Sequence, residues 1–314
     1  MIALDVLRTV AILLVTHSHM DAFYPVPELA TGGLLGNTLF FFVSGYGLQL
    51  SLGRRLVSFW PWYLRRAWRV YAPMWIALAI LIPLVFRPES MGATLALLLV
   101  PREYWFLPTI TALYVPAYFV MTRLEPLVVL RLVVGILGVY VLASLAVADP
   151  GRWNVEDSIP LKALFYFAVM TLGIYAAKAR WVARPGDVLL AAGLTIAFFG
   201  YLLMLQMTEF FVLQAGANLL ALAWATVLFR ALSDEAVGDS LERRAGPAIH
   251  FLSAITLQMY LVQVPLVGHG ELEALPFPMN VLLFWGLLVI LAWGLALLTR
   301  ALTGSPPGKG GDPK

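Results

Sequence analysis

Long apolar runs separated by short polar loops dominate the chain. Runs of about 17 to 25 residues can cross the hydrocarbon core of a bilayer, and the pattern predicts ten of them. The shorter run 91–100 is predicted to lie at the interface or to dip into the protein. The ten predicted spans cover residues 2–22, 32–52, 71–86, 104–121, 127–147, 160–177, 187–206, 213–232, 248–267 and 279–300. This pattern predicts an all-α, polytopic membrane bundle of about ten transmembrane helices.

The composition agrees with a membrane protein surrounded by lipid. Of the 314 residues, 61% are hydrophobic and 12% are charged, whereas soluble domains carry roughly 25% charged residues. A soluble core of this length could not bury so much apolar surface. We expect one membrane domain over residues 1–302. Residues 303–314, rich in Gly, Pro and Lys, are predicted to form a disordered cytoplasmic tail.

Cysteine is absent, and the net charge is only +3. The lack of cysteine excludes disulfides, thiolate metal ligands and a cysteine nucleophile, and no metal is expected. Because the basic residues fall in short clusters between apolar runs, they do not form a footprint for nucleic acid.

Lys and Arg gather in alternate loops, and this asymmetry predicts orientation. The basic set of loops and the tail contain Arg54, Arg55, Arg65, Arg66, Arg69, Arg123, Lys178, Arg180, Arg184, Arg230, Arg243, Arg244, Lys309 and Lys314. The other set holds little beyond Arg87, Arg102 and Arg152 and is richer in acid. Basic loops stay inside, so both termini are predicted to be cytoplasmic. That result requires an even number of spans and favours ten.

Residues 4–20 of the first apolar run contain four ionisable groups, and helical phase divides them. At about 100° per residue, Arg8 and His19 fall within about 20° of each other, whereas His17 lies about 180° from Arg8. Asp5 precedes Arg8 by three residues and is close enough to pair with it. Ionisable groups in a span are costly and often functional, and a neutral imidazole can act as a base. The alternative is a structural Asp5–Arg8 pair with both histidines at the outer interface.

Two further motifs follow. In "FFFVSGYGLQL", Ser44 and Gly45 interrupt an apolar run, which is common where helices pack closely. In "WYLRRAWRVYAP", Arg65 and Arg69 are one turn apart, with Arg66 beside Arg69. This arginine cluster either only sets topology, with lipid headgroups as partners, or recognises a multiply phosphorylated ligand.

Together these segments resemble the integral-membrane acyltransferase family 3 over most of the first 120 residues. The family pattern LDxLRxxAxxxVxxxH is met by Leu4, Asp5, Leu7, Arg8, Ala11, Val15 and His19. Its FFxxSGF element is similar to Phe41, Phe42, Ser44, Gly45 and Tyr46, with tyrosine in place of the usual phenylalanine. Its RRxxRxxP element is similar to Arg65, Arg66, Arg69 and, one residue later than usual, Pro73. Its WFL segment matches Trp105 to Leu107.

The chain departs from the family near its C-terminus. Many members carry SxxxYLxH there, whereas this chain has Gln263 where the histidine would stand. The acidic residue that some members have in the fourth span is also missing. Both departures bear on acceptor specificity more than on the type of reaction.

The resemblance implies transfer of an acyl group, commonly acetyl, from cytoplasmic acyl-coenzyme A to a hydroxyl of a glycan or lipid-linked sugar, in the cell (inner) membrane. Arg65, Arg66 and Arg69 would hold the coenzyme A phosphates. His19 would be the general base, and Arg8 would contact the donor.

Ser44 and Gly45 would belong to the donor site and let the acyl chain pass close to the backbone. Asp5 would orient Arg8, and the other supporting residues would be Tyr46, Trp105 and Gln263. The main alternative is a transporter or flippase that uses the same polar stripe, and a third hypothesis is a silent scaffold that binds anionic lipid.

Overall fold

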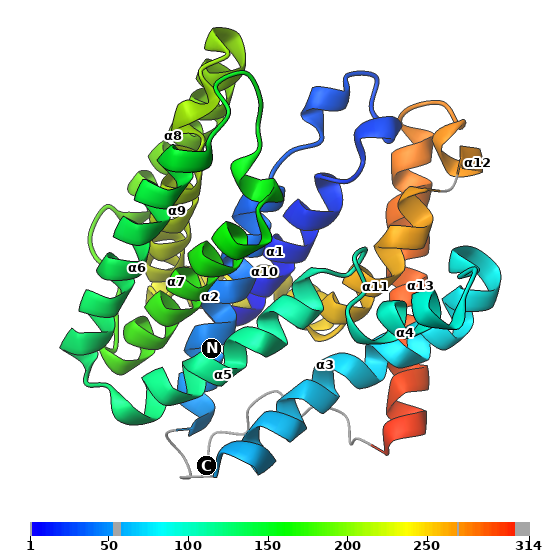
Figure 1. Cartoon of the computed structure of the whole chain (residues 1–314), viewed down its shortest axis with the longest axis horizontal. Coiled ribbons are helices and arrows are strands. Elements are labelled where there is room, and N and C mark those ends of the chain that lie inside the picture. Colours follow the sequence, from blue (N-terminus) through cyan, green and yellow to red (C-terminus); the bar gives the residue numbers. More distant parts are fainter. Residues whose placement is uncertain (1, 53–57, 269, 305–314) are drawn as a thin grey trace. The chain divides into compact units, whose positions relative to one another are not determined.

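The computed structural model describes residues 2–52, 58–268 and 270–304, and no β-strand occurs within these ranges (Figure 1). The all-α prediction is confirmed for this part of the chain. Arg54, Arg55, Lys309, Lys314 and the tail beyond residue 304 lie outside the described residues. The longer helices are α1 (Ile2–His17), α2 (Gly33–Leu52), α3 (Phe59–Leu81), α4 (Met91–Leu99), α5 (Phe106–Arg123), α6 (Pro126–Val147), α7 (Ile159–Lys178), α8 (Asp187–Thr208), α9 (Ala215–Leu232), α10 (Glu235–Ala254), α11 (Thr256–Val267) and α13 (Met279–Thr303).

Six helices among the described residues are long and apolar enough to cross a membrane. They are Phe59–Phe86, Pro126–Val147, Ile159–Lys178, Asp187–Thr208, Phe211–Leu232 and Met279–Thr303. The count becomes seven if the bent pair α10 and α11 is taken as one span. The predicted runs 2–22, 32–52 and 104–121 form α1, α2 and α5, which do not meet this criterion. The predicted count of ten is therefore not confirmed, and the orientation of the termini stays a prediction.

Helix α1 ends at His17 and is therefore shorter than the predicted span 2–22. The Ser18 hydroxyl donates to the carbonyl of Val15 at 2.8 Å and so competes for the backbone of the last turn. The next N–H groups, of His19 and Met20, bond to carbonyls only three residues earlier. His19 therefore lies outside the helix, and the helical phase that groups it with Arg8 does not extend to it.

The predicted span 248–267 is also interrupted. Helix α10 ends at Ala254 and α11 begins at Thr256, with a bend of 66° between them. Pro247 lies inside α10 and Pro265 inside α11. The apolar run predicted as one straight helix is thus the end of a charged helix followed by a short apolar one.

The chain forms two compact units, and each is built from three separate stretches of sequence. Unit 1 comprises the described residues within 1–11, 34–57 and 113–249, and unit 2 those within 12–33, 58–112 and 250–314. No single cut in the sequence therefore separates the two units. One membrane domain over residues 1–302 stays a prediction.

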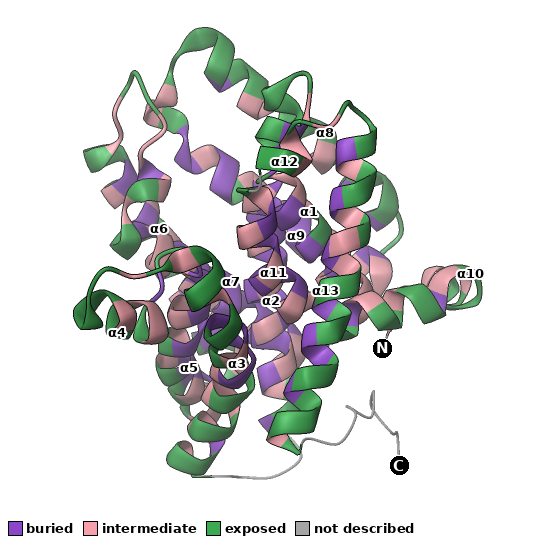
Figure 2. Ribbon diagram, turned by 90° about the vertical axis from the view of Figure 1, so that its right-hand side faces the viewer, coloured by how far each residue is buried: buried purple, intermediate pink, exposed green. Residues whose placement is uncertain are grey.

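In unit 1, helix α6 packs on α7 and α8 packs on α9. Helix α7 is buried over much of its length, while α6 and α8 bury few residues and expose long apolar sides (Figure 2). Such exposed apolar sides are what lipid would cover. At the end of this group, Arg230 of α9 forms an ion pair with the buried carboxylate of Asp187, at the start of α8.

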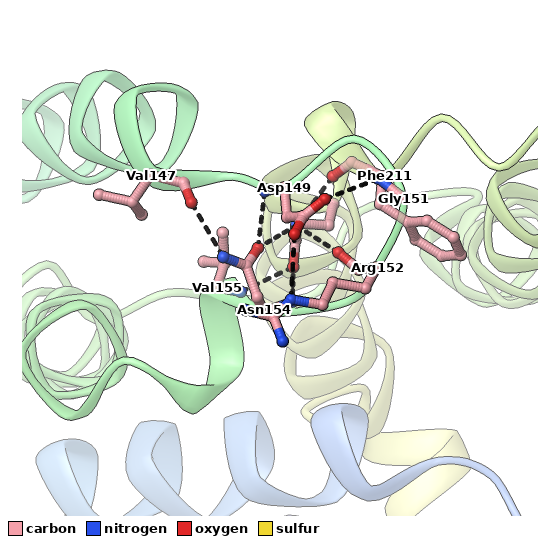
Figure 3. A network of polar contacts seen from close by, with 8 residues as sticks. Val147, Asp149, Gly151, Arg152, Asn154, Val155 and Phe211 are labelled. Atoms are coloured by element: carbon pink, nitrogen blue, oxygen red, sulfur yellow. Dashed lines mark hydrogen bonds and ion pairs between the residues drawn. The ribbon is translucent and has the colours of Figure 1, made fainter.

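A network of hydrogen bonds around Asn154 holds the loop between α6 and α7 (Figure 3). Gln214 stands just before α9 and is 1% exposed. Its Oε1 accepts the N–H groups of Asn154 and Val155, each at 2.8 Å. Its Nε2 donates to Asn154 Oδ1 at 3.0 Å and to the carbonyl of Phe211 at 2.9 Å. Both polar atoms of this buried amide are therefore hydrogen-bonded within the protein.

In unit 2, helix α11 packs against α3 and α13. Pro265 has no N–H to bond the carbonyl of Leu261 four residues earlier. The hydroxyl of the fully buried Tyr104 donates to that carbonyl instead, at 2.7 Å. A side chain from just before α5 thus completes the hydrogen bonding of a helix far away in the sequence.

Candidate active site

A groove of about 760 Å³ lies along α3 in unit 2. Arg65 and Arg69 both line it, as their spacing of one turn predicts. Aromatic and apolar side chains make up most of the rest: Tyr63, Leu64, Trp68, Tyr71, Trp75 and Leu99. The groove therefore combines two guanidinium groups with several exposed rings, which suits a ligand that carries both phosphate and a flat base.

Hydrogen bonds to α4 hold the aromatic wall in place. Trp75 Nε1 donates to the carbonyl of Leu98 at 2.9 Å, and the Tyr71 hydroxyl donates to the carbonyl of Leu99 at 3.2 Å. The ring centroids of Trp68 and Trp75 are 6.2 Å apart, nearly edge to face. These carbonyls belong to the end of α4, so the short apolar helix supports one side of the groove.

Arg66 behaves differently from the other two arginines of the cluster. Its guanidinium lies over the ring of Trp62, 5.1 Å from the centroid, and it does not line the groove. A cation over an aromatic face is a stabilising contact within the helix itself. The sequence carried the signal for this contact, since Trp62 precedes Arg66 by four residues.

Arg8 and Asp5 form the ion pair that their spacing predicts, with Arg8 Nη1 3.0 Å from Asp5 Oδ1 in unit 1. The guanidinium also lies next to Gly47 of α2: a Cβ at that position would be 3.9 Å from Arg8 Nη2. Both side chains of the pair are only partly exposed. The carboxylate thus orients the cation and offsets its charge.

The two histidines after Thr16 have different surroundings in unit 2. A ring nitrogen of His17, Nδ1, is 2.9 Å from the carbonyl of Thr31, and the ring packs on Tyr24 with centroids 5.3 Å apart. Because a carbonyl can only accept, Nδ1 of His17 carries the proton. The His19 ring makes no hydrogen bond to any residue that the structure describes, and the side chain is exposed.

His19 follows the end of α1 and lies outside every candidate membrane-spanning helix. Although the His19 side chain is exposed, the protein around its ring removes part of the solvent. This desolvation lowers the pKa of the imidazole below its ordinary value, and the nearby charge of Asp21 opposes part of the shift. A lowered pKa keeps the imidazole neutral near pH 7, which is the form that can accept a proton.

Comparison with known proteins now gives the family. A family model described as an acyltransferase domain matches residues 1–300. The chain belongs to acyltransferase family 3. No curated protein and no solved structure matches it. The family supports acyltransferase activity in general, and the apolar helices support an integral membrane protein.

In this acyltransferase, the residues of the FFxxSGF element pack against other helices of unit 1. A Cβ added to Gly45 would overlap the backbone carbonyl of Met170, and one added to Gly173 would overlap that of Phe42. The two glycines therefore let α2 and α7 approach closely. Tyr46 is buried and its ring lies 4.7 Å from that of Phe229. This packing accounts for Gly45 without a ligand. Ser44 beside it is half-buried, and the role of both residues toward the donor stays a prediction.

Two further predicted residues of the acyltransferase lie in unit 2. Trp105 is half-buried beside Phe106, with ring centroids 6.3 Å apart. Gln263 is 1% exposed, and its Oε1 accepts the hydroxyl of Thr16 at 2.6 Å. Neither Thr16 nor Tyr104 was singled out from the sequence. Only the position of Pro265, four residues after Leu261, signals that a carbonyl of α11 needs another donor.

Proposed function

We propose that this chain is a membrane O-acyltransferase of the cell (inner) membrane. It moves an acyl group, acetyl in our proposal, from acyl-coenzyme A to a hydroxyl of a glycan or lipid-linked sugar. The observation that carries the proposal is the groove along α3, where Arg65 and Arg69 lie beside exposed aromatic rings. Coenzyme A presents phosphates and an adenine, and this groove offers a partner for each.

The proposed reaction uses His19 as general base. Its neutral imidazole takes the proton of the acceptor hydroxyl, and the oxygen attacks the carbonyl carbon of the thioester. The carbon–sulfur bond then breaks, and the histidine returns the proton to the departing thiolate. We assign the base to His19 because its ring is not engaged by the described residues, whereas the His17 ring is fastened to Thr31.

Arg8 is assigned to the same reaction on the family pattern, as a cation toward the acyl donor that Asp5 holds in place. Arg66 takes a supporting role in this proposal, because its contact with Trp62 stiffens the first turns of the helix that carries Arg65 and Arg69.

The experiment measures binding and slow hydrolysis of acetyl-coenzyme A by the purified chain in detergent. His19→Ala should bind the donor normally and lose turnover by about 10²- to 10⁴-fold, while His17→Ala keeps most of it. Arg65→Ala with Arg69→Ala should weaken binding at least about tenfold, because each charge-assisted hydrogen bond is lost. The matched control is Arg243→Ala with Arg244→Ala, which removes the same charge from α10.

Each alternative gives a different result. If both double arginine variants weaken binding equally, the groove has no special role. If His17→Ala alone abolishes turnover, the base is His17, acting through Nε2. A wild-type chain that neither binds nor hydrolyses the donor would favour the transporter or flippase.

A further inference from the structure

Gln263 is held in a single orientation by Thr16. The two side chains are 1% and 0% exposed, and the Thr16 hydroxyl donates to Gln263 Oε1 at 2.6 Å. A separation of 2.6 Å is typical of an O–H···O bond and short for N–H···O. The amide oxygen therefore faces the hydroxyl, and the amide nitrogen points the other way. Gln263 Nε2 is buried and has no hydrogen-bond acceptor among the described residues.

A buried N–H without an acceptor is unfavourable, and folded proteins leave few of them. A neighbouring polar group of α11 that lacks its usual helical partner does have another one. The carbonyl of Leu261, two residues before Gln263, is freed by Pro265 and receives the Tyr104 hydroxyl. The carbonyl of Leu261 thus has a hydrogen-bond donor, whereas Gln263 Nε2, in the same turn, has no acceptor among the described residues.

The same threonine links Gln263 to the histidine of the proposed reaction. The carbonyl of Thr16 accepts the backbone N–H of His19 at 3.1 Å. Thr16 thus fixes the turn that carries His19 through its backbone and orients the Gln263 amide through its hydroxyl. Both effects lie within unit 2.

We propose that Gln263 donates its side-chain N–H to the carbonyl oxygen of the acyl group during transfer, with Thr16 as the positioning residue. This inference rests on the proposed acyltransferase function. An N–H donor suits that oxygen better than the acceptor hydroxyl, because donation to the attacking oxygen would weaken its nucleophilicity. When that oxygen attacks, the carbonyl oxygen gains negative charge, which the N–H stabilises until the carbon–sulfur bond breaks.

The test uses the purified full chain in detergent with acetyl-coenzyme A and water as the acceptor. Gln263→Met keeps the length of the side chain and removes the N–H, and Gln263→His returns a donor to this position. Thr16→Val removes the orienting hydroxyl with little change of shape, and Thr16→Ser keeps it. Three quantities are compared: the Kd for acetyl-coenzyme A, the turnover at saturating donor, and the midpoint of thermal unfolding.

Gln263→Met should lower turnover by about 10²- to 10³-fold, with an unchanged Kd. Its thermal midpoint should fall no further than that of Thr16→Val, because both substitutions break the same hydrogen bond. Thr16→Val should lower turnover roughly tenfold, whereas Thr16→Ser and Gln263→His should retain most of it. The inference is overturned if Gln263→Met keeps wild-type turnover, or if binding, turnover and thermal stability all fall together. If the wild type itself does not bind acetyl-coenzyme A, the proposed function fails first, and this inference fails with it.

Discussion

Two buried glutamines, each 1% exposed, have opposite hydrogen-bonding environments. Gln214 in unit 1 uses both amide atoms to hold the loop before α7, with two N–H groups on its oxygen. Gln263 in unit 2 uses only its oxygen, and its nitrogen has no acceptor among the described residues. A fully bonded buried amide stabilises a fold, whereas a half-bonded one leaves a donor for something else. The comparison therefore separates a structural glutamine from a candidate functional one.

The largest expected effect is a difference in the free energy of unfolding between two single variants, Gln214→Met and Gln263→Met. Gln214→Met leaves the N–H groups of Asn154 and Val155 without their acceptor, and it should lower the free energy of unfolding by about 3 kcal/mol. Gln263→Met removes a nitrogen that is already without an acceptor among the described residues, and it takes the acceptor from one buried hydroxyl, that of Thr16. Its cost should therefore be clearly smaller, about 1 kcal/mol. The measurement is reversible unfolding of both variants in one detergent.

Equal destabilisation by the two substitutions would contradict the comparison. A useful control is Gln214→Glu, which keeps the oxygen that accepts both N–H groups and removes the nitrogen that donates to Asn154 and Phe211. It should fall between the wild type and Gln214→Met at a pH where the carboxyl is protonated.

The sequence predicts those structural features that depend on residues close together in the chain. The helical class and the Asp5–Arg8 pair follow from residues a few positions apart, since the geometry of a helical turn determines both. The position of Arg65 and Arg69 on one groove follows in the same way.

What local spacing does not determine could not be predicted. Thr16 and Gln263 are 247 residues apart, so their contact depends on how α1 and α11 pack. The end of α1 at His17 depends on Ser18 bonding the backbone, and hydropathy does not register such a bond. Hydropathy does not predict the bend between α10 and α11, because an apolar run has the same hydropathy whether its helix is straight or broken.

An intermediate effect is expected at the second polar contact of α11. Tyr104→Phe leaves the carbonyl of Leu261 without a donor and should cost about 1 kcal/mol. In a Pro265→Ala background the new backbone N–H can reach that carbonyl, so the same change should cost clearly less. The double-mutant cycle on unfolding free energies measures this difference. Additive costs would mean that the tyrosine does not replace the missing N–H.

The smallest effect concerns Glu156, which lies in the loop between α6 and α7 that Gln214 also holds. Its Oε1 accepts Asn218 Nδ2, one turn after Gln214 on α9. Burial raises the pKa of the Glu156 carboxyl, although the bond from Asn218 and the charge of Lys162 oppose the shift. Between its ordinary pKa of about 4.3 and this raised value, the folded chain binds more protons than the unfolded chain. Stability should therefore fall as pH rises through that interval and stay level below it. Glu156→Gln should flatten this part of the profile of unfolding free energy against pH, and an unchanged slope would show that another group titrates there.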